Sequence, residues 1–173
     1  TNHTRAGLLE TLHAMGGQIK LQSERKQAGE PLADLHITAS ALHGVEVNGE
    51  VVVRMIDEFP IFTVAALRAK GKTLVRDAAE LRLKESDRID VVVEELTKLG
   101  AKITPHPDGF EIDGPQTLSG GVATSHRDHR LAMSLAIAGL TATGETIIED
   151  AEELNESFPG FVETVRSMGA KIE

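Results

Sequence analysis

The chain contains no cysteine among its 173 residues. Disulfides, thiolate metal sites and a cysteine nucleophile are therefore excluded within it. No apolar run approaches the roughly 20 residues that a membrane-spanning helix needs, and no signal peptide is visible. Basic side chains are outnumbered, because 18 Lys and Arg stand against 27 Asp and Glu, for a net charge of −9. Such a surface repels nucleic acid and anionic membranes, so an anion site must be a local basic pocket.

The chain is long enough for a real hydrophobic core. A chain of this size buries roughly 70% of its unfolded surface. No shift in composition marks a linker, so we expect a single domain covering residues 1–173. A cytoplasmic protein fits this composition best. The sequence opens at Thr1-Asn2 without an initiator Met, which suggests a piece of a longer protein.

The run Lys84-Glu85-Ser86-Asp87-Arg88 places two cations, two carboxylates and a hydroxyl just before a helix. The helix is indicated by apolar residues at helical spacing, namely Ile89, Val92, Val93, Leu96 and Leu99. A helix N-terminus carries partial positive charge, so Lys and Arg are unfavourable there by about 0.3–1 kcal/mol unless an anion joins them. The run therefore favours a phosphate or carboxylate site. The alternative is a solvated salt-bridge cluster, because the charges have i, i+3 and i, i+4 spacing.

One supersecondary unit is repeated along the chain. The stretch from Gly71 to Asp77 recurs 73 positions later, from Gly144 to Asp150. Three other segments each read as helix, glycine and then strand, and their glycines fall where a left-handed helix C-cap is needed. These glycines are Gly16, Gly100 and Gly169. We therefore expect a first repeat at about residues 1–75, a second at about 76–150 and a partial third at 151–173.

Each unit is expected to run strand, helix, strand, helix, strand, strand, which gives an α/β (α+β) fold of βαβαββ units. Helices expected within 57–71 and 130–144 are apolar almost throughout, which predicts burial on most sides. Asp108-Gly109 predicts a hairpin turn, and residues 22–32 predict a mobile hairpin tip. Strands are predicted at Gln18–Gln22, Ala33–Ala39, Val51–Met55, Lys72–Arg76, Lys102–Pro105, Gly109–Ile112 and Glu145–Glu149.

Candidate chemistry gathers where the two apolar helices begin. Asp57 stands three residues before Pro60, either as an ordinary helix cap or as a carboxylate able to act as a general base. The repeat places Arg130 at the position equivalent to Asp57, inside the cluster His126-Arg127-Asp128-His129-Arg130. Cations at two helix N-termini together predict a convergent anion pocket.

Metal binding is the alternative function of that cluster. His126, Asp128 and His129 could collect a divalent cation, but Arg127 and Arg130 would repel it at close range. We therefore expect no metal ion and no other cofactor. The pair Gly120-Gly121 lacks the Gly-x-x-x-x-Gly-Lys pattern of a phosphate-binding loop.

Four motifs together resemble the 5-enolpyruvylshikimate-3-phosphate synthases, a branch of the enolpyruvyl transferase family. The likeness covers nearly the whole chain, from about Thr4 to its end, and corresponds to the C-terminal part of those enzymes. The motifs occur in family order and are Asp57-Glu58-Phe59-Pro60, the stretch Glu80 to Ile89, Asp128-His129-Arg130-Leu131-Ala132-Met133 and Ser157-Phe158-Pro159-Gly160-Phe161. The alternatives are the branch acting on UDP-N-acetylglucosamine, which shares the fold, and a non-catalytic anion-binding module.

The resemblance implies transfer of the enolpyruvyl group of phosphoenolpyruvate to the 5-hydroxyl of shikimate 3-phosphate, in aromatic amino-acid biosynthesis. By family pattern Asp57 would accept the proton of that hydroxyl, and Glu85 would exchange protons with the methylene carbon of phosphoenolpyruvate. The remaining site residues would bind substrate. Lys84 would contact the shikimate substrate, and Arg88, His129 and Arg130 the carboxylate and phosphate of phosphoenolpyruvate. Glu80 matches a substrate-contacting position where some members carry Asn.

Two departures from the family pattern matter. Glu156 occupies a position where some members carry a Lys that helps to bind phosphoenolpyruvate. The family enzyme is also about two and a half times as long and closes two lobes over its substrates. The resemblance therefore implies one lobe, with helices inside and sheets facing solvent about a pseudo-threefold axis. Its first unit should lack an opening strand, and without the N-terminal lobe the chain should be folded but nearly inactive.

Overall fold

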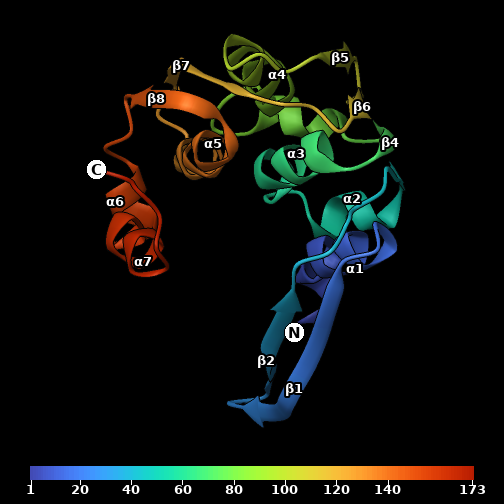
Figure 1. Ribbon diagram of the computed structural model, residues 1–173. Helices are drawn as coiled ribbons and strands as arrows, with labels where there is room; N and C mark the ends of the chain where they lie inside the picture. Colours follow the sequence, from blue (N-terminus) through green and yellow to red (C-terminus); the bar gives the residue numbers. More distant parts are fainter.

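The computed structural model describes all residues, 1–173, and packs three helices against its strands (Figure 1). These helices are α3 (Phe59–Arg68), α4 (Arg88–Lys98) and α5 (His129–Thr141). A core of 26 buried hydrophobic residues joins them, with Phe62 of α3, Leu96 of α4 and Leu135 of α5 among its members. The expectation of buried helices under solvent-facing sheets is confirmed.

Only one of the three sheets has four strands. Its order is β3 (Glu46–Val47), β4 (Gly71–Val75), β6 (Gly109–Gly114) and β5 (Ile103–His106). The β3–β4 pair is parallel, and the other two pairs are antiparallel. The two-stranded sheets are the antiparallel pair β1 (Gln18–Gln27) with β2 (Glu30–Thr38) and the parallel pair β7 (Ser119–Thr124) with β8 (Thr143–Glu149).

The repeat seen in the sequence is a repeat of β–α–β units. The unit β3–α3–β4 corresponds to β7–α5–β8, and both contain the same close approach, just before β3 in the first unit and within β7 in the second. A Cβ placed on Gly44 would lie 2.1 Å from the carbonyl oxygen of Lys72, and one on Gly120 would lie 2.1 Å from that of Glu145. Lys72 and Glu145 are again 73 positions apart. Glycine is therefore required for steric reasons at equivalent points of both units.

The strand predicted at Val51–Met55 is wrong, because this segment forms helix α2 (Glu50–Arg54). A short apolar run fits a buried strand and a short helix equally well. Gly49, with φ of 60°, turns the chain just before the run, and β3 is already paired with β4. The helix then buries Val52 and leaves Val53 64% exposed. Strands β3 and β7 were not predicted from the sequence.

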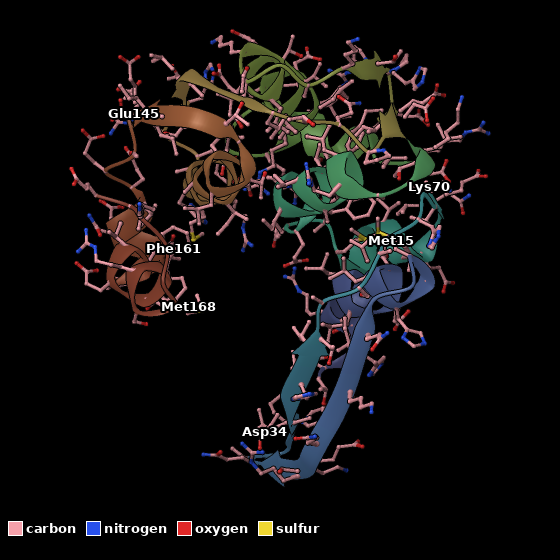
Figure 2. All side chains as sticks on the ribbon, in the orientation of Figure 1. Met15, Asp34, Lys70, Glu145, Phe161 and Met168 are labelled. Carbon is pink, nitrogen blue, oxygen red and sulfur yellow. The ribbon has the colours of Figure 1, made fainter.

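Residues 22–32 include the predicted hairpin tip, but most of them belong to strands and not to the tip itself. Strands β1 and β2 continue through most of them to a turn at Ala28-Gly29, with a bulge between Gln22 and Arg25. The hairpin projects from the body of the molecule (Figure 1), and Asp34 of β2 pairs with Arg25 of β1 at 3.2 Å near its far end (Figure 2). Cross-strand pairing therefore orders a segment whose composition is that of a loop.

The remaining helices flank the core at its two ends. Helix α1 (Gly7–Ala14) packs near the base of the hairpin, and α6 (Leu154–Ser157) and α7 (Phe161–Ser167) lie beyond α5 (Figure 1). Phe161 and Val165 of α7 pack with Ala132 and Ala136 of α5 in a second, smaller core. None of the helices is both long enough and apolar enough to cross a bilayer.

Of the three predicted helix–glycine–strand segments, two form as expected. Gly16, Gly100 and Gly169 all have positive φ, at 91°, 89° and 97°. Strands β1 and β5 follow the first two, but residues 170–173 form no strand after the third. An extended segment is a β-strand only when a neighbouring strand pairs with it, and no strand lies beside this one.

Candidate functional site

Asp57 lies in the tight turn between two helices. Helix α2 ends at Arg54 and α3 begins at Phe59, so Asp57 precedes the cap position, which Glu58 occupies without a side-chain capping bond. The Asp57 carboxylate instead accepts hydrogen bonds from two arginines, Arg88 at 3.2 Å and Arg5 at 3.1 Å. The structure thus assigns this aspartate to a charge cluster and not to a helix cap.

Arg88 is the centre of that cluster. It is the first residue of α4, whose N-cap is Asp87, and its side chain is completely buried. The guanidinium donates from Nε to Asp128 Oδ2 at 2.8 Å, from Nη1 to Asp57 Oδ1 at 3.2 Å and from Nη2 to Glu85 Oε2 at 2.7 Å. A buried arginine is tolerated when carboxylates satisfy its donors in this way. Arg88 therefore ties α4 to the turns that precede α3 and α5.

Arg130 reaches the same aspartate from the second unit. It follows His129 at the start of α5, where Asp128 is the N-cap and accepts from the amides of Arg130 and Leu131. Its Nη2 lies 3.6 Å from Asp57 Oδ2, and its Nη1 donates to the Asp57 carbonyl oxygen at 3.4 Å. The two guanidinium groups of α4 and α5 thus approach the two different oxygens of one carboxylate.

These contacts and the partial burial of the site shift the pKa values of its acids. Burial would raise the pKa of Asp57, but Arg130, Arg5 and Arg88 together hold that pKa below its ordinary value. Burial opposes the ionised form of Asp128 as well, yet Arg88 and two backbone amides lower its pKa. Glu58 behaves in the opposite way, because burial raises its pKa and Arg130 offsets the rise only in part.

The cluster is less basic than the pocket expected from the sequence. Arg88 has no donor directed to solvent, because three carboxylates take its hydrogen bonds. The side chain of Arg130 is 35% exposed and that of Arg5 is 61% exposed. An anion arriving from solvent would therefore meet Arg130 and Arg5, with Arg88 holding the acids behind them.

The other predicted site residues lie at the margin of the cluster. Glu85 is more than half exposed and contacts only Arg88 through its carboxylate. Lys84 forms an ion pair with Glu80 at 3.3 Å, which keeps both outside the Arg88 network. His129 is half-buried at the first position of α5, and its ring makes no hydrogen bond. The structure therefore joins Asp57, Glu85, Arg88 and Arg130 directly, and Lys84, Glu80 and His129 only through neighbouring positions in the chain.

Sequence reasoning missed a second buried carboxylate. Glu95 of α4 is fully buried and accepts from the Thr124 amide at 2.8 Å and from Lys98 Nζ at 2.7 Å. Its Oε1 also lies 2.6 Å from His126 Nε2. Burial would raise the pKa of Glu95, but Lys98, the Thr124 amide and His126 hold it below its ordinary value. Glu95 anchors the turn after β7, where His126 and Arg127 have φ of 53° and 59°.

The metal set weighed from the sequence does not assemble. Asp128 faces Arg88 and His126 faces Glu95, so these two side chains belong to different clusters. A different trio, Glu94, Glu95 and His126, brings its ligand atoms within 4.8 Å of one another. The Lys98 ammonium contacts both carboxylates of that trio and takes the place a cation would use.

The signal for the Asp128 contact was present but incomplete. Asp before an apolar helical run indicates an N-cap, and Asp128 does cap α5. Its other carboxylate oxygen, Oδ2, accepts from Arg88 Nε at 2.8 Å and from Ser86 Oγ at 3.1 Å. This second role of Asp128 depends on residues 40 and 42 positions earlier in the sequence, which local sequence patterns do not reveal.

Comparison with known proteins places this geometry in a family. The sequence model described as EPSP synthase (3-phosphoshikimate 1-carboxyvinyltransferase) matches residues 1–165. A 3-phosphoshikimate 1-carboxyvinyltransferase of Acaryochloris marina is 52% identical over 167 residues, covering 96% of this chain and 37% of the relative. The Brevibacillus brevis enzyme of the same name is 50% identical over 160 residues, covering 92% of this chain and 38% of the relative.

Solved structures give the same result. An EPSP synthase from Acinetobacter baumannii superposes with a TM-score of 0.96 at 42% identity, covering 99% of this chain and 40% of that one. The enolpyruvyl transferase NikO from Streptomyces tendae, at 21% identity and a TM-score of 0.74, shares the fold over 98% of this chain and 36% of its own. The chain thus spans about 37–40% of the length of the enzymes that it matches closely.

Proposed function

The chain belongs to the EPSP synthase (3-phosphoshikimate 1-carboxyvinyltransferase) family, and we propose that it forms the C-terminal lobe of such an enzyme. The proposed reaction passes the enolpyruvyl group of phosphoenolpyruvate to the 5-hydroxyl of shikimate 3-phosphate and releases phosphate. The observation that carries the proposal is the convergence of Arg88 and Arg130, from the N-termini of α4 and α5, on the two oxygens of Asp57 in the first repeat.

Asp57 is the proposed acceptor of the hydroxyl proton. The arginines keep it ionised, but a carboxylate with a lowered pKa is a weak base at neutral pH. The contacts from Arg130, at 3.4 and 3.6 Å, are longer than those that Arg5 and Arg88 make with Asp57, at 3.1 and 3.2 Å. A phosphoenolpyruvate anion that draws Arg130 to itself would remove part of the positive field from Asp57 and so make it more basic.

Glu85 is the proposed group that exchanges a proton with the methylene carbon. Its carboxylate is held by Arg88 on one side and is exposed on the other, which leaves one oxygen free to face a substrate. Lys84 would contact shikimate 3-phosphate after leaving Glu80, and His129 would join Arg130 at the phosphoenolpyruvate anion. Glu156, on α6, is exposed and supplies no cation to that anion.

A second lobe is the partner that this site needs. With Glu85 and Arg130 open to solvent, the chain alone cannot exclude water or fix two reactants. We therefore expect the isolated chain to show little turnover in a phosphate-release assay. Co-expression with an N-terminal lobe of a relative should restore activity, and turnover within about tenfold of ordinary enzymes by the chain alone would contradict this expectation.

Paired variants of the completed enzyme test the individual roles. Asp57→Asn and Glu85→Gln should lower kcat by about 10²–10⁴-fold, as expected for the loss of proton transfer. Glu94→Gln is the control, because Glu94 is an exposed carboxylate on α4 that contacts Lys98 only. Circular dichroism should show all three folded. Full activity of the Asp57 and Glu85 variants would refute both assignments.

Arginine variants test anion binding. Arg130→Met should raise the KM for phosphoenolpyruvate, because the exposed cation next to Asp57 is lost. Arg127→Met removes an arginine three positions away whose guanidinium contacts Glu153 instead, and it should leave KM unchanged. Equal effects of the two substitutions would mean that overall charge, and not the site, attracts the substrate.

A further inference from the structure

Glu58 is a partly buried acid whose carboxylate neither caps its helix nor forms a close ion pair. It stands at the N-cap of α3, where its carbonyl oxygen accepts from the Phe62 amide at 2.9 Å but its carboxylate makes no capping bond. The side chain is 28% exposed, and the oxygen Oε2 is buried with no hydrogen-bond partner. The one ion pair that Glu58 forms is with Arg130, whose Nη1 lies 3.8 Å from Oε1.

Glu95 shows how a structural buried glutamate is satisfied in the same chain. Lys98 Nζ donates to its Oε1 at 2.7 Å, and the Thr124 amide donates to its Oε2 at 2.8 Å. Burial would raise the pKa of Glu95, but these donors and His126 hold it below its ordinary value. Glu58 has no such donors, so burial dominates and its pKa is raised. Its ionised form therefore depends mainly on the single long contact with Arg130.

The Arg130 guanidinium is itself held loosely. Its contacts are the Asp57 carbonyl oxygen at 3.4 Å, Asp57 Oδ2 at 3.6 Å and Glu58 Oε1 at 3.8 Å. Charge-assisted hydrogen bonds of good geometry are shorter, at about 2.7–2.9 Å. Asp57 also accepts hydrogen bonds from Arg5 and Arg88, whereas Glu58 contacts no second cation. An anion that takes Arg130 would therefore leave Asp57 paired and Glu58 unpaired.

A partly buried carboxylate that loses its cation and gains an anion as a neighbour is unfavourable in its ionised form. We propose that Glu58 competes with the substrate anion for Arg130, and that it gives up this contact by taking a proton from solvent. Glu58 is a positioning residue, because it acts on the Arg130 guanidinium and touches no substrate itself. Its role in turnover rests on the proposed function, but the competition for Arg130 does not.

The direction of the pH dependence follows from the charges that face Glu58. These are Arg130 from α5, the neighbouring Asp57 and Arg5 from the turn at His3–Arg5. Burial raises the pKa of Glu58 and Arg130 lowers it, so an anion that neutralises Arg130 raises that pKa further and protons are taken up on binding. By linkage, the anion binds most tightly when Glu58 is protonated, and its affinity falls as the pH rises through the pKa of Glu58.

Sulfate is a suitable probe, because its own charge is constant over the range in which Glu58 titrates. It is titrated into the ¹⁵N-labelled chain at about pH 5 and about pH 8, and binding is followed at the Nε–Hε group of Arg130. We expect sulfate to bind about fivefold more weakly, or less tightly still, at the higher pH, which is a usual size for coupling between sites. Glu58→Gln should bind sulfate at the higher pH nearly as tightly as the unaltered chain does at the lower pH.

Glu94→Gln is the matched control. It removes the same charge from an exposed carboxylate that contacts Lys98, so it should bind sulfate as the unaltered chain does at both pH values. Histidines also change charge in this range, and any effect of His129 beside Arg130 is common to both variants. The proposal therefore requires a smaller pH dependence in Glu58→Gln than in Glu94→Gln. Equal pH dependence in the two variants would overturn it, and so would the absence of a sulfate response at Arg130.

The carboxyl ¹³C signal of Glu58 provides a direct readout. Saturating sulfate should raise the pKa of Glu58 in the unaltered chain, and Arg130→Met should raise it in the same direction without sulfate. In Arg130→Met, added sulfate should then have no further effect on this pKa. A pKa of Glu58 that sulfate leaves unchanged in the unaltered chain would contradict the proposed competition.

The completed enzyme tests the role in turnover. Relative to the unaltered enzyme, Glu58→Gln should lower the KM for phosphoenolpyruvate about fivefold at about pH 8 and much less at about pH 5. It should leave kcat nearly unchanged, because Glu58 is already neutral once the anion is bound. A KM ratio that is the same at both pH values would mean that Glu58 acts only as a structural residue. An enzyme without turnover would refute the proposed function, and the sulfate titrations would then decide the competition for Arg130 independently.

Discussion

Arg88 and Asp128 form an ion pair in which both side chains are completely inaccessible to solvent, with Nε and Oδ2 2.8 Å apart. The pair joins the first residue of α4 to the N-cap of α5, so one contact fixes the relative position of two helix N-termini. The proposed substrate-binding residues project from these two ends. Their geometry therefore depends on a contact that touches no substrate.

Breaking this pair should be far more destabilising than replacing it. Arg88→Met alone leaves Asp128 buried without its main partner, and Asp128→Leu alone leaves Arg88 short of one, so each should cost about 3–5 kcal/mol. The double variant removes both charges and should recover much of that loss. Urea unfolding of the three variants measures the difference. A double variant as unstable as the sum of the singles would show that the pair is not coupled.

Acid should destabilise the fold through the acids whose pKa values are lowered. A group whose folded-state pKa lies below its unfolded value adds stability above the unfolded pKa and loses it as the pH falls through the folded pKa. Asp57, Asp128 and Glu95 all belong to this class. The free energy of unfolding should therefore be steady from about pH 7 to 5 and fall below about pH 5.

The Asp128→Asn variant tests how much of this acid-induced loss of stability comes from Asp128. It should have a lower free energy of unfolding at pH 7, and this should decline less steeply than that of the unaltered chain between about pH 5 and 3. An exposed acid such as Glu24 supplies the control, because Glu24→Gln should leave the slope unchanged. Parallel curves for the Asp128 variant and the unaltered chain would contradict the assignment.

Glu58 should affect the pH dependence of stability in the opposite sense to Asp57, Asp128 and Glu95. Its folded-state pKa is raised by burial, so the stability linked to its protonated form is present at low pH and lost as the pH rises through that pKa. One carboxylate oxygen, Oε2, is buried without a partner. Glu58→Gln should therefore stabilise the chain at pH 7, by less than about 1 kcal/mol. Thermal unfolding at pH 7 and pH 4 checks this, with the gain expected only at pH 7.

The sequence was most informative where a local pattern and its environment agree. Helices α4 and α5 begin at Arg88 and His129, directly after aspartates that cap them, and their apolar spacing predicted their buried faces. Asp57, Glu85, Arg88 and Arg130 could be selected for the same reason, since charges at helix N-termini stand out from their surroundings. The single-domain interpretation stays a prediction.

The sequence was least informative where a partner far along the chain decides the outcome. Val51–Met55 became a helix because β3 already fills the place beside β4. Residues 170–173 stayed outside any strand because no strand lies beside them. The three carboxylates on Arg88 come from positions 57, 85 and 128. No local pattern predicts that this cation is sealed from solvent.

Glu95 should control the turn that leads to the proposed anion site. Its carboxylate holds the Thr124 amide and His126 immediately before Asp128 and Arg130. Glu95→Gln keeps the size but removes the charge that Lys98 and His126 contact, and should cost about 1–3 kcal/mol. Hydrogen exchange at residues 124–127 should accelerate. Glu94→Gln, one position earlier and exposed, is the control and should change neither quantity.

The steric requirement at Gly120 can be separated from the general sensitivity of β7. Gly120→Ala would place a methyl group 2.1 Å from the Glu145 carbonyl oxygen, so the β7–β8 pair must separate. Gly121→Ala, the next residue of the same strand, would meet its nearest atom at an ordinary 3.4 Å. Neither position has positive φ, so backbone conformation does not distinguish them. We expect the free energy of unfolding to fall by about 2–4 kcal/mol for Gly120→Ala and to change by less than about 1 kcal/mol for Gly121→Ala.

Gly44→Ala, the equivalent beside β4, should match Gly120→Ala, because the repeat imposes the same approach on both units. Similar stabilities of the Gly120 and Gly121 variants in urea would show that the two strands can move apart freely.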